Sequence, residues 1–304
     1  MNTPLTTRSC AALALLSVVV VVAGALALAA CGGTSWTPSA APSWSSTMSP
    51  APIPVVKPGQ QLPPWSQILA LYAYDHSEPL ATQLGTADAF KKSGVTFTPI
   101  AFVVNGRYAI GCLVLPQGDG PFPAVIYAPG NPGSVTDTWA EDAASLAKQG
   151  YAALLLDGVT GLGSNWGKLR PMVAAQVFRD YVIQERRGIG LLETMPKIDA
   201  SRIGFVGFST GAVVGGILSG VDGRVRAFAL DGVHETVRGA NAAFDAEIAL
   251  LNPPLYLSHN KDSAFFFTWG KSGDAAPPSV QKRFVAAAGP NATVFQHLGG
   301  HQVT

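Results

Sequence analysis

One serine stands in a pattern typical of a catalytic nucleophile. The segment Gly207-Phe208-Ser209-Thr210-Gly211 has the form Gly-x-Ser-x-Gly, in which the serine occupies a sharp turn between a strand and a helix. The two glycines leave room for the strand and the helix to pass close to each other. Because glycine makes up 33 of the 304 residues, the match alone does not establish a role for Ser209. A buried serine at a tight turn is the structural alternative.

A serine hydroxyl is a weak nucleophile, so it needs a base, and the base needs an acid that orients it. After a Gly-x-Ser-x-Gly turn, the acid and the histidine follow in that order along the chain. Asp262 comes just beyond the apolar run Leu255–Ser258, which we interpret as a strand, and we predict Asp262 as the acid, with Asp231 as the alternative. His301 lies in a loop and is the predicted base, whereas His297 falls inside an apparent strand and is the second choice.

Acyl transfer also requires hydrogen-bond donors for the negative charge that develops on the carbonyl oxygen. The backbone N–H of Thr210, next to the nucleophile, is one predicted donor. The other is expected in the loop after the run "AVIYAPG", where Pro132 has no N–H; we predict Asn131, with Gly133 as the alternative. A Gly/Pro turn without a catalytic role is the structural alternative. The spacing of Cys and His residues matches no metal site, so no metal is predicted.

These residues depend on strands and helices that alternate along the chain. Two β-rich runs flank Asn105-Gly106 and predict an antiparallel hairpin. We then expect strands over 124–127, 152–156, 202–208, 225–230, 255–258 and 293–298, and helices over 138–149, 171–195, 210–218 and from 278. Apolar strands that alternate with helices predict an α/β fold, with a mostly parallel sheet covered by helices on both faces. Ser209 then directly follows a strand and precedes a helix.

The first 31 residues have the features of an export signal. Arg8 precedes a long apolar run, and Leu28-Ala29-Ala30-Cys31 resembles a bacterial lipobox, in which the cysteine becomes the lipidated first residue of the mature protein. Cleavage after an alanine and an uncleaved membrane helix are the alternatives. The sequence therefore predicts an extracytoplasmic domain, with a lipid on Cys31 that binds it to a membrane; a secreted or periplasmic soluble protein is the alternative.

Composition separates a tether from the domain that follows it. Residues 32–64 are dominated by Pro, Ser, Thr and Ala without strand or helix periodicity, which predicts an extended tether. Residues 65–304 form the predicted single domain, for which a hydrophobic content of 48% supplies an ample core. A net charge of +1 without a Lys/Arg run argues against nucleic acid as a partner.

Taken together, these segments resemble the α/β-hydrolase superfamily, specifically its dienelactone hydrolase and acetyl xylan esterase-like branch. The resemblance rests on "GPFPAVIYAPGNPGS", "GYAALLLDGVTGLGSN", "PKIDASRIGFVGFSTGAVVGG", "PPLYLSHNKD" and "GGH", which follow the family's order over roughly residues 95–301. It implies a serine hydrolase that cleaves carboxylic esters of small molecules or polymers through an acyl-enzyme, without a cofactor. Ser209 would be the nucleophile, Asp262 the acid and His301 the base.

The sequence departs from the family in three places. Pro129-Gly130 replaces the usual His-Gly, and Ser209 stands where dienelactone hydrolases often have cysteine, which favours an esterase. The chain ends three residues after His301, where the family continues with a helix, so we expect a weakly held base. Two alternatives follow: a hydrolase-fold surface lipoprotein with weak or no catalysis and a binding role, and a lactone hydrolase that uses the same residues.

Overall fold

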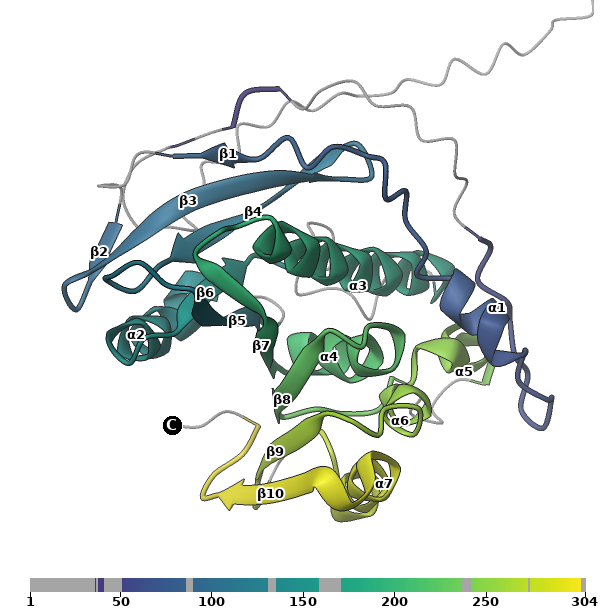
Figure 1. Cartoon of the computed structure of the whole chain (residues 1–304). Coiled ribbons are helices and arrows are strands. Elements are labelled where there is room, and N and C mark those ends of the chain that lie inside the picture. The colour runs from purple at the N-terminus through teal and green to yellow at the C-terminus, as the bar shows by residue number, and fades with distance from the viewer. Residues whose placement is uncertain are drawn as a thin grey trace, which may run out of the picture.

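A computed structural model describes residues 36, 38–40, 51–85, 90–130, 135–158, 171–236, 242–272 and 274–301. A ten-stranded sheet runs through the molecule in the order β1-β3-β4-β6-β5-β7-β8-β9-β10, with β2 paired to β3 (Figure 1). The strands are β1 (Gln83–Leu84), β2 (Phe90–Lys92), β3 (Val95–Val104), β4 (Arg107–Val114), β5 (Phe122–Ala128), β6 (Ala152–Leu156), β7 (Ile198–Phe208), β8 (Val225–Asp231), β9 (Ala264–Gly270) and β10 (Ala292–His297).

Helices connect these strands. They are α1 (Trp65–Ala70), α2 (Val135–Lys148), α3 (Pro171–Glu193), α4 (Thr210–Val221), α5 (Ala242–Ile248), α6 (Pro253–Leu257) and α7 (Pro278–Ala288), with short 3-10 turns at Ala249–Leu251 and Gly289–Asn291. The strands from β6 through β10 pair in parallel, whereas β1 to β4 are antiparallel. The predicted mostly parallel sheet with an antiparallel entry is therefore confirmed.

The predicted hairpin joins β3 and β4. Asn105 and Gly106 have φ angles of 50° and 72°, the two positive values that a tight two-residue hairpin turn requires. The carboxylate of Glu78 accepts hydrogen bonds from both backbone N–H groups, at 3.0 and 2.7 Å. Arg187 of α3 lies 3.7 Å from that carboxylate, so the turn is joined to the helix layer beside it.

Helices cover both faces of the parallel part of the sheet. Alternate residues of β6 show this: Leu154 and Leu156 belong to the large core shared with α3 and α4, whereas Leu155 packs in a second core with Ala143 and Ala144 of α2. The period of two along a strand sends successive side chains to opposite faces. Because both faces are buried, the strand reads as an unbroken apolar run, as the sequence predicted.

One strand lies later in the chain than predicted. The run Leu255–Ser258 is not a strand, because Pro253 and Pro254 open the helix α6, a position at which proline is favoured. The next strand is β9, where Phe265, Phe267 and Trp269 form a stacked row of buried rings and Phe266 faces the other way, 42% exposed. Phe265, Phe267 and Trp269 are therefore packed in the main core.

The predicted boundary between tether and domain needs correction. Ile53 and Val56 are buried in the main core, and the backbone N–H of Val56 donates to the carbonyl of Ala246 at 2.8 Å. These two apolar side chains among the prolines of the segment are buried in the domain, although the composition of the segment is typical of an extended tether. Residues 51–64 thus pack with the domain. Cys31 and the rest of the predicted signal lie outside the described residues. Among the residues that the structure describes, no helix is long and apolar enough to span a membrane.

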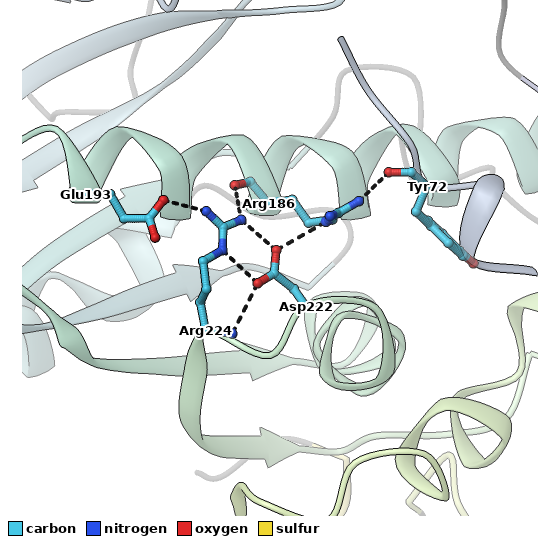
Figure 2. Close-up of polar contacts among 5 residues, drawn as sticks. All are labelled: Tyr72, Arg186, Glu193, Asp222 and Arg224. Carbon is cyan, nitrogen blue, oxygen red and sulfur yellow. Dashed lines mark hydrogen bonds and ion pairs between the residues drawn. The ribbon is translucent and has the colours of Figure 1, made fainter. Parts of the chain in front are cut away.

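A charged network joins α3 to the end of α4 (Figure 2). The buried carboxylate of Asp222 lies 3.1 Å from Arg186 and 2.6 Å from Arg224, and Arg224 also contacts Glu193 at 2.6 Å. Arg186 donates to the backbone carbonyl of Tyr72, which ties in the segment after α1. Burial alone would raise the pKa of Asp222, but the two guanidinium groups lower it below its ordinary value. The carboxylate is therefore held in its charged form.

Candidate active site

Ser209 occupies a strained turn between β7 and α4. Its backbone has φ 51° and ψ −112°, a positive φ that non-glycine residues rarely adopt. Two backbone hydrogen bonds hold it there: Ser209 N–H donates to Asp231 at 2.8 Å, and its carbonyl accepts from Val213 at 3.0 Å. The strain is the expected signature of a functional turn. The predicted strand–Ser–helix arrangement is confirmed.

The glycines of the pattern are needed because the backbones approach too closely for side chains. A Cβ on Gly207 would lie 2.5 Å from the carbonyl oxygen of Gly211. A Cβ on Gly211 would lie 2.2 Å from the carbonyl oxygen of Ala128, at the end of β5. Helix α4 therefore passes directly against the neighbouring strand, and Ser209 sits at the carboxyl edge of the parallel strands, where open α/β sheets bind ligands.

Three side chains from separate segments meet at this edge. His301 Nε2 lies 2.8 Å from Ser209 Oγ, and His301 Nδ1 lies 3.2 Å from Asp274 Oδ1. With a proton on Nδ1, the imidazole donates to the carboxylate and Nε2 can accept the serine proton. The structure thus brings together Ser209 and His301, as predicted, and places Asp274 where the sequence led us to expect Asp262.

The Asp262 prediction is therefore corrected. Asp262 is exposed and precedes β9, at the amino end of that strand, whereas the nucleophile lies at the carboxyl edge. Asp274 follows β9, whereas the prediction of Asp262 depends on a strand at Leu255–Ser258 that the structure does not contain. The aromatic run of β9, which ends at Gly270, carries a stronger strand signal and points to Asp274 as the next carboxylate.

Backbone hydrogen bonds hold the carboxylate of Asp274 in one orientation. Its side chain is only 3% exposed, and Oδ2 accepts from the backbone N–H of Gly270 at 2.6 Å. Oδ1 accepts from the backbone N–H of Ala276 at 3.2 Å as well as facing His301. Since these donors hold both oxygens, the carboxylate presents one of them to the imidazole in a set direction.

The loop that carries His301 is held from several sides. Lys271 N–H donates to the carbonyl of His297 at 3.0 Å, and Ser272 N–H donates to that of Gly299 at 3.1 Å. The His301 ring lies 5.3 Å, centre to centre, from the ring of Phe208. The expected weak support of the base is thus not what the structure shows. His297, the second choice, is buried in β10 and does not contact Ser209 Oγ; His301 does.

One of the two predicted oxyanion donors can be located. Thr210 is the first residue of α4, where backbone N–H groups have no acceptor within the helix. Asn131 and its alternative Gly133 lie outside the described residues. Gly130, just before them, lies beside the nucleophile: a Cβ there would be 3.2 Å from Ser209 Cβ. The loop after β5 therefore starts at the nucleophile, as an oxyanion loop must.

A second carboxylate lies beside these residues. Asp231, the alternative acid, ends β8, and its side chain accepts a hydrogen bond from the hydroxyl of Thr268 on β9 instead of contacting His301 directly. Burial and the Asp274 carboxylate raise the pKa of Asp231. The hydrogen bond from Thr268 and the charges of His297 and His301 lower it. The net effect is a raised pKa.

Comparison with known proteins identifies the family. Residues 69–245, more than half of the chain, match the sequence profile described as esterase FrsA-like. Esterase FrsA of Escherichia coli O157:H7 is 29% identical over 163 residues, which cover 49% of this chain and 37% of that relative. The chain thus spans little more than a third of that esterase's length. The profile match includes Ser209 and ends before Asp274 and His301.

Solved structures share the fold at low sequence identity. The acetyl xylan esterase from Paenibacillus sp. R4 has a TM-score of 0.64 and 17% identity, covering 79% of this chain and 88% of that one. A glucuronoyl esterase from Solibacter usitatus has a TM-score of 0.59 and 14% identity, covering 86% and 95%. These similarities confirm the α/β-hydrolase fold. The profile match, which covers more than half of the chain, shows that the chain belongs to the FrsA-like esterase family.

Proposed function

We propose that this protein hydrolyses carboxylic esters with Ser209 as nucleophile, His301 as base and Asp274 as the orienting acid. The observation that carries the proposal is the pair of contacts from one imidazole, 2.8 Å to Ser209 Oγ and 3.2 Å to Asp274 Oδ1. Three residues from distant parts of the chain meet in the order that acyl transfer to serine requires. Membership in an esterase family supports the same reaction.

The reaction follows from these contacts. Ser209 Oγ attacks the ester carbonyl while His301 Nε2 takes its proton, and the imidazolium that forms is stabilised by the Asp274 carboxylate. The carbonyl oxygen becomes an oxyanion, which the Thr210 N–H is placed to stabilise. His301 then gives its proton to the departing alkoxide, leaving an acyl group on Ser209. Water attacks the acyl-enzyme with His301 again as base, which releases the acid and restores the serine.

A probe for an activated serine tests this proposal. Purified protein should react with a fluorophosphonate and hydrolyse p-nitrophenyl acetate, and Ser209→Ala should abolish both while the circular dichroism spectrum is unchanged. Ser258→Ala, which removes an exposed hydroxyl on another part of the molecule, is the matched control and should retain both activities. A folded wild-type protein that neither reacts with the probe nor cleaves any ester in a panel of acetyl, longer acyl and lactone substrates would support a binding role instead.

The related structures suggest a substrate class. The related structures are named for acetylated xylan and glucuronoyl esters, and we propose that this chain likewise acts on esters of small molecules or polysaccharides. A panel of p-nitrophenyl esters and acetylated xylan, assayed for released acetate, separates these groups. Equal rates on lactones and on open esters would favour the lactone hydrolase alternative.

We also propose export with a lipid anchor on Cys31. The proposal is supported by Arg8, the apolar run that follows it and the lipobox-like Leu28–Cys31. Expression in bacteria fed an alkyne fatty acid should label the wild-type protein and place it in the membrane fraction. Cys31→Ser should remove the label. Release of a soluble, unlabelled wild-type protein would favour ordinary cleavage after an alanine.

A further inference from the structure

Asp231 lies next to both Ser209 and His301: its backbone carbonyl contacts Ser209, and the residue after it, Gly232, contacts His301. Its carbonyl accepts the hydrogen bond from Ser209 N–H, at 2.8 Å, so Asp231 helps to hold the strained turn. The next residue, Gly232, lies directly beneath the imidazole: a Cβ there would be 2.9 Å from His301 Nδ1 and 2.7 Å from its Cε1. The base thus rests on the residue that follows Asp231 at the end of β8.

The Asp231 side chain lies among the groups of the site. Thr268, its partner in the register of β8 and β9, donates its hydroxyl to the carboxyl group. The titratable groups that act on it electrostatically are His297 of β10, His301 in the loop after β10, and Asp274 in the loop after β9. Asp231 thus ends a strand that neighbours the one before Asp274, and of the two carboxylates only Asp274 is hydrogen-bonded to the imidazole. The ring of His234 also lies near this imidazole, 6.3 Å from the His301 ring centre to centre.

We propose that Asp231 is a second positioning carboxylate for His301, whose negative charge stabilises the imidazolium formed when Ser209 is deprotonated. The inference rests on the proposed esterase mechanism. Asp274 orients the ring through Nδ1, whereas Asp231 acts through space, since its side-chain hydrogen bond is made to Thr268. The two contributions differ in kind: one fixes the tautomer and direction of the ring, and the other adds charge to its surroundings.

The pH profile of kcat/KM separates this role from a structural one. Loss of a nearby negative charge disfavours the protonated imidazole, so Asp231→Asn should move the acid limb of the profile to lower pH by about one pH unit. Thr268→Val removes the donor that favours ionised Asp231, and it should shift the limb in the same direction by a smaller amount. Asp262→Asn makes the same chemical change at an exposed site at the other end of β9, and its profile should match wild type.

A double variant tests whether the two carboxylates support the same base. Asp274→Asn should leave a residual rate that depends on Asp231, so Asp231→Asn/Asp274→Asn should be slower by about tenfold more. Asp262→Asn/Asp274→Asn should be no slower than Asp274→Asn alone. Two results together would overturn the proposal. One is that Asp231→Asn/Asp274→Asn is as fast as Asp274→Asn alone, and the other is that the acid limb of Asp231→Asn stays at its wild-type pH.

Titration of His301 by NMR keeps this test separate from the test of esterase activity. The Hε1 signal, assigned with His301→Gln in ¹³C-histidine protein, should titrate about one pH unit lower in Asp231→Asn than in wild type. If wild type proves inactive on all esters, the proposed function fails, yet this shift still decides whether Asp231 acts on His301. An identical His301 titration in both proteins refutes that action. Should Asp231→Asn not fold, Thr268→Val supplies the comparison, with a smaller expected shift in the same direction.

Discussion

Ser209 combines a reactive position with a costly backbone conformation. A non-glycine residue with φ 51° and ψ −112° costs on the order of 1–3 kcal/mol, and such strain persists only where the surroundings enforce it. Here the hydrogen bond to Asp231 and the close contact of Gly211 with β5 do so. The turn places Oγ outside the helix, 2.8 Å from the imidazole, instead of within the packed start of α4.

The acid assignment gives a direct comparison of two aspartates. Asp274→Asn keeps the shape of the side chain but removes the charge and favours the wrong tautomer of His301, so kcat should fall by about 10³- to 10⁴-fold. Asp262→Asn should leave kcat within about twofold, because that side chain is exposed and lies away from the carboxyl edge. Steady-state hydrolysis of p-nitrophenyl acetate measures both. The reverse result would restore Asp262 as the acid.

These residues differ in how far the sequence could identify them. Ser209 is recognised locally, since the turn, the strand before it and the helix after it are contiguous. His301 follows from the chain order, because few histidines come late enough. Asp274 could not be reached in this way: its place depends on which run forms the last strand before it. The prolines at the start of α6 and the aromatic residues of β9 decide that question only when they are weighed together.

Helix α3 carries a buried carboxyl group that the reaction does not use. Glu185 is 0% exposed, and neither carboxyl oxygen has a hydrogen-bond partner among the described residues. Burial raises the pKa of Glu185 well above its ordinary value, and the neighbouring Gln184 opposes this shift without reversing it. The group is therefore protonated in the folded protein over a range where it is ionised in the unfolded chain.

This proton makes stability depend on pH. Above pH 4.5, the ordinary pKa of a glutamate, the folded state binds a proton that the unfolded state has lost, so folding stability falls as pH rises. Glu185→Gln removes that dependence. The difference in free energy of unfolding between Glu185→Gln and wild type should therefore increase, in favour of the variant, by about 1.4 kcal/mol per pH unit above 4.5. The increase stops at the pKa of Glu185 in the folded state.

Urea unfolding between pH 5 and pH 9 measures the difference. Glu141→Gln is a suitable control, because Glu141 is exposed and its pKa is lowered by hydrogen bonds to Ser93 and Lys92. It should show no gain that grows with pH. A constant offset between Glu185→Gln and wild type across this range would contradict the assignment of a protonated Glu185.

At the scale of the whole molecule, the segment before α1 is part of the folded unit. Residues 51–64 follow the domain surface, with Ile53 and Val56 in the core and Arg179 of α3 donating to the carbonyl of Ala51 at 3.2 Å. The sequence could not reveal this, because a run rich in proline has no period that distinguishes buried from exposed positions. The alternating strands and helices, by contrast, have such a period, and the sheet they form was predicted.

The contribution of this segment can be measured by paired substitutions. Ile53→Ala removes a buried side chain and should lower the free energy of unfolding by about 2–4 kcal/mol. Val55→Ala, two residues later at a site that is 44% exposed, should change it by less than about 0.5 kcal/mol. Chemical denaturation of the full chain compares them. Equal, small effects would mean that residues 51–64 detach in solution.

Residues 36 and 39 are also attached to the domain, and this limits how far the domain can lie from Cys31. The Trp36 ring lies 3.1 Å from where a Cβ of Gly85 would be, and Ser39 is hydrogen-bonded to Gln83 of β1. Only four residues separate Trp36 from Cys31, and a fully stretched chain covers about 18 Å over those five steps. A lipid on Cys31 would therefore keep Trp36 and the adjoining β1 edge within about 18 Å of the lipidated residue, close to the bilayer surface, instead of at the end of a long stalk.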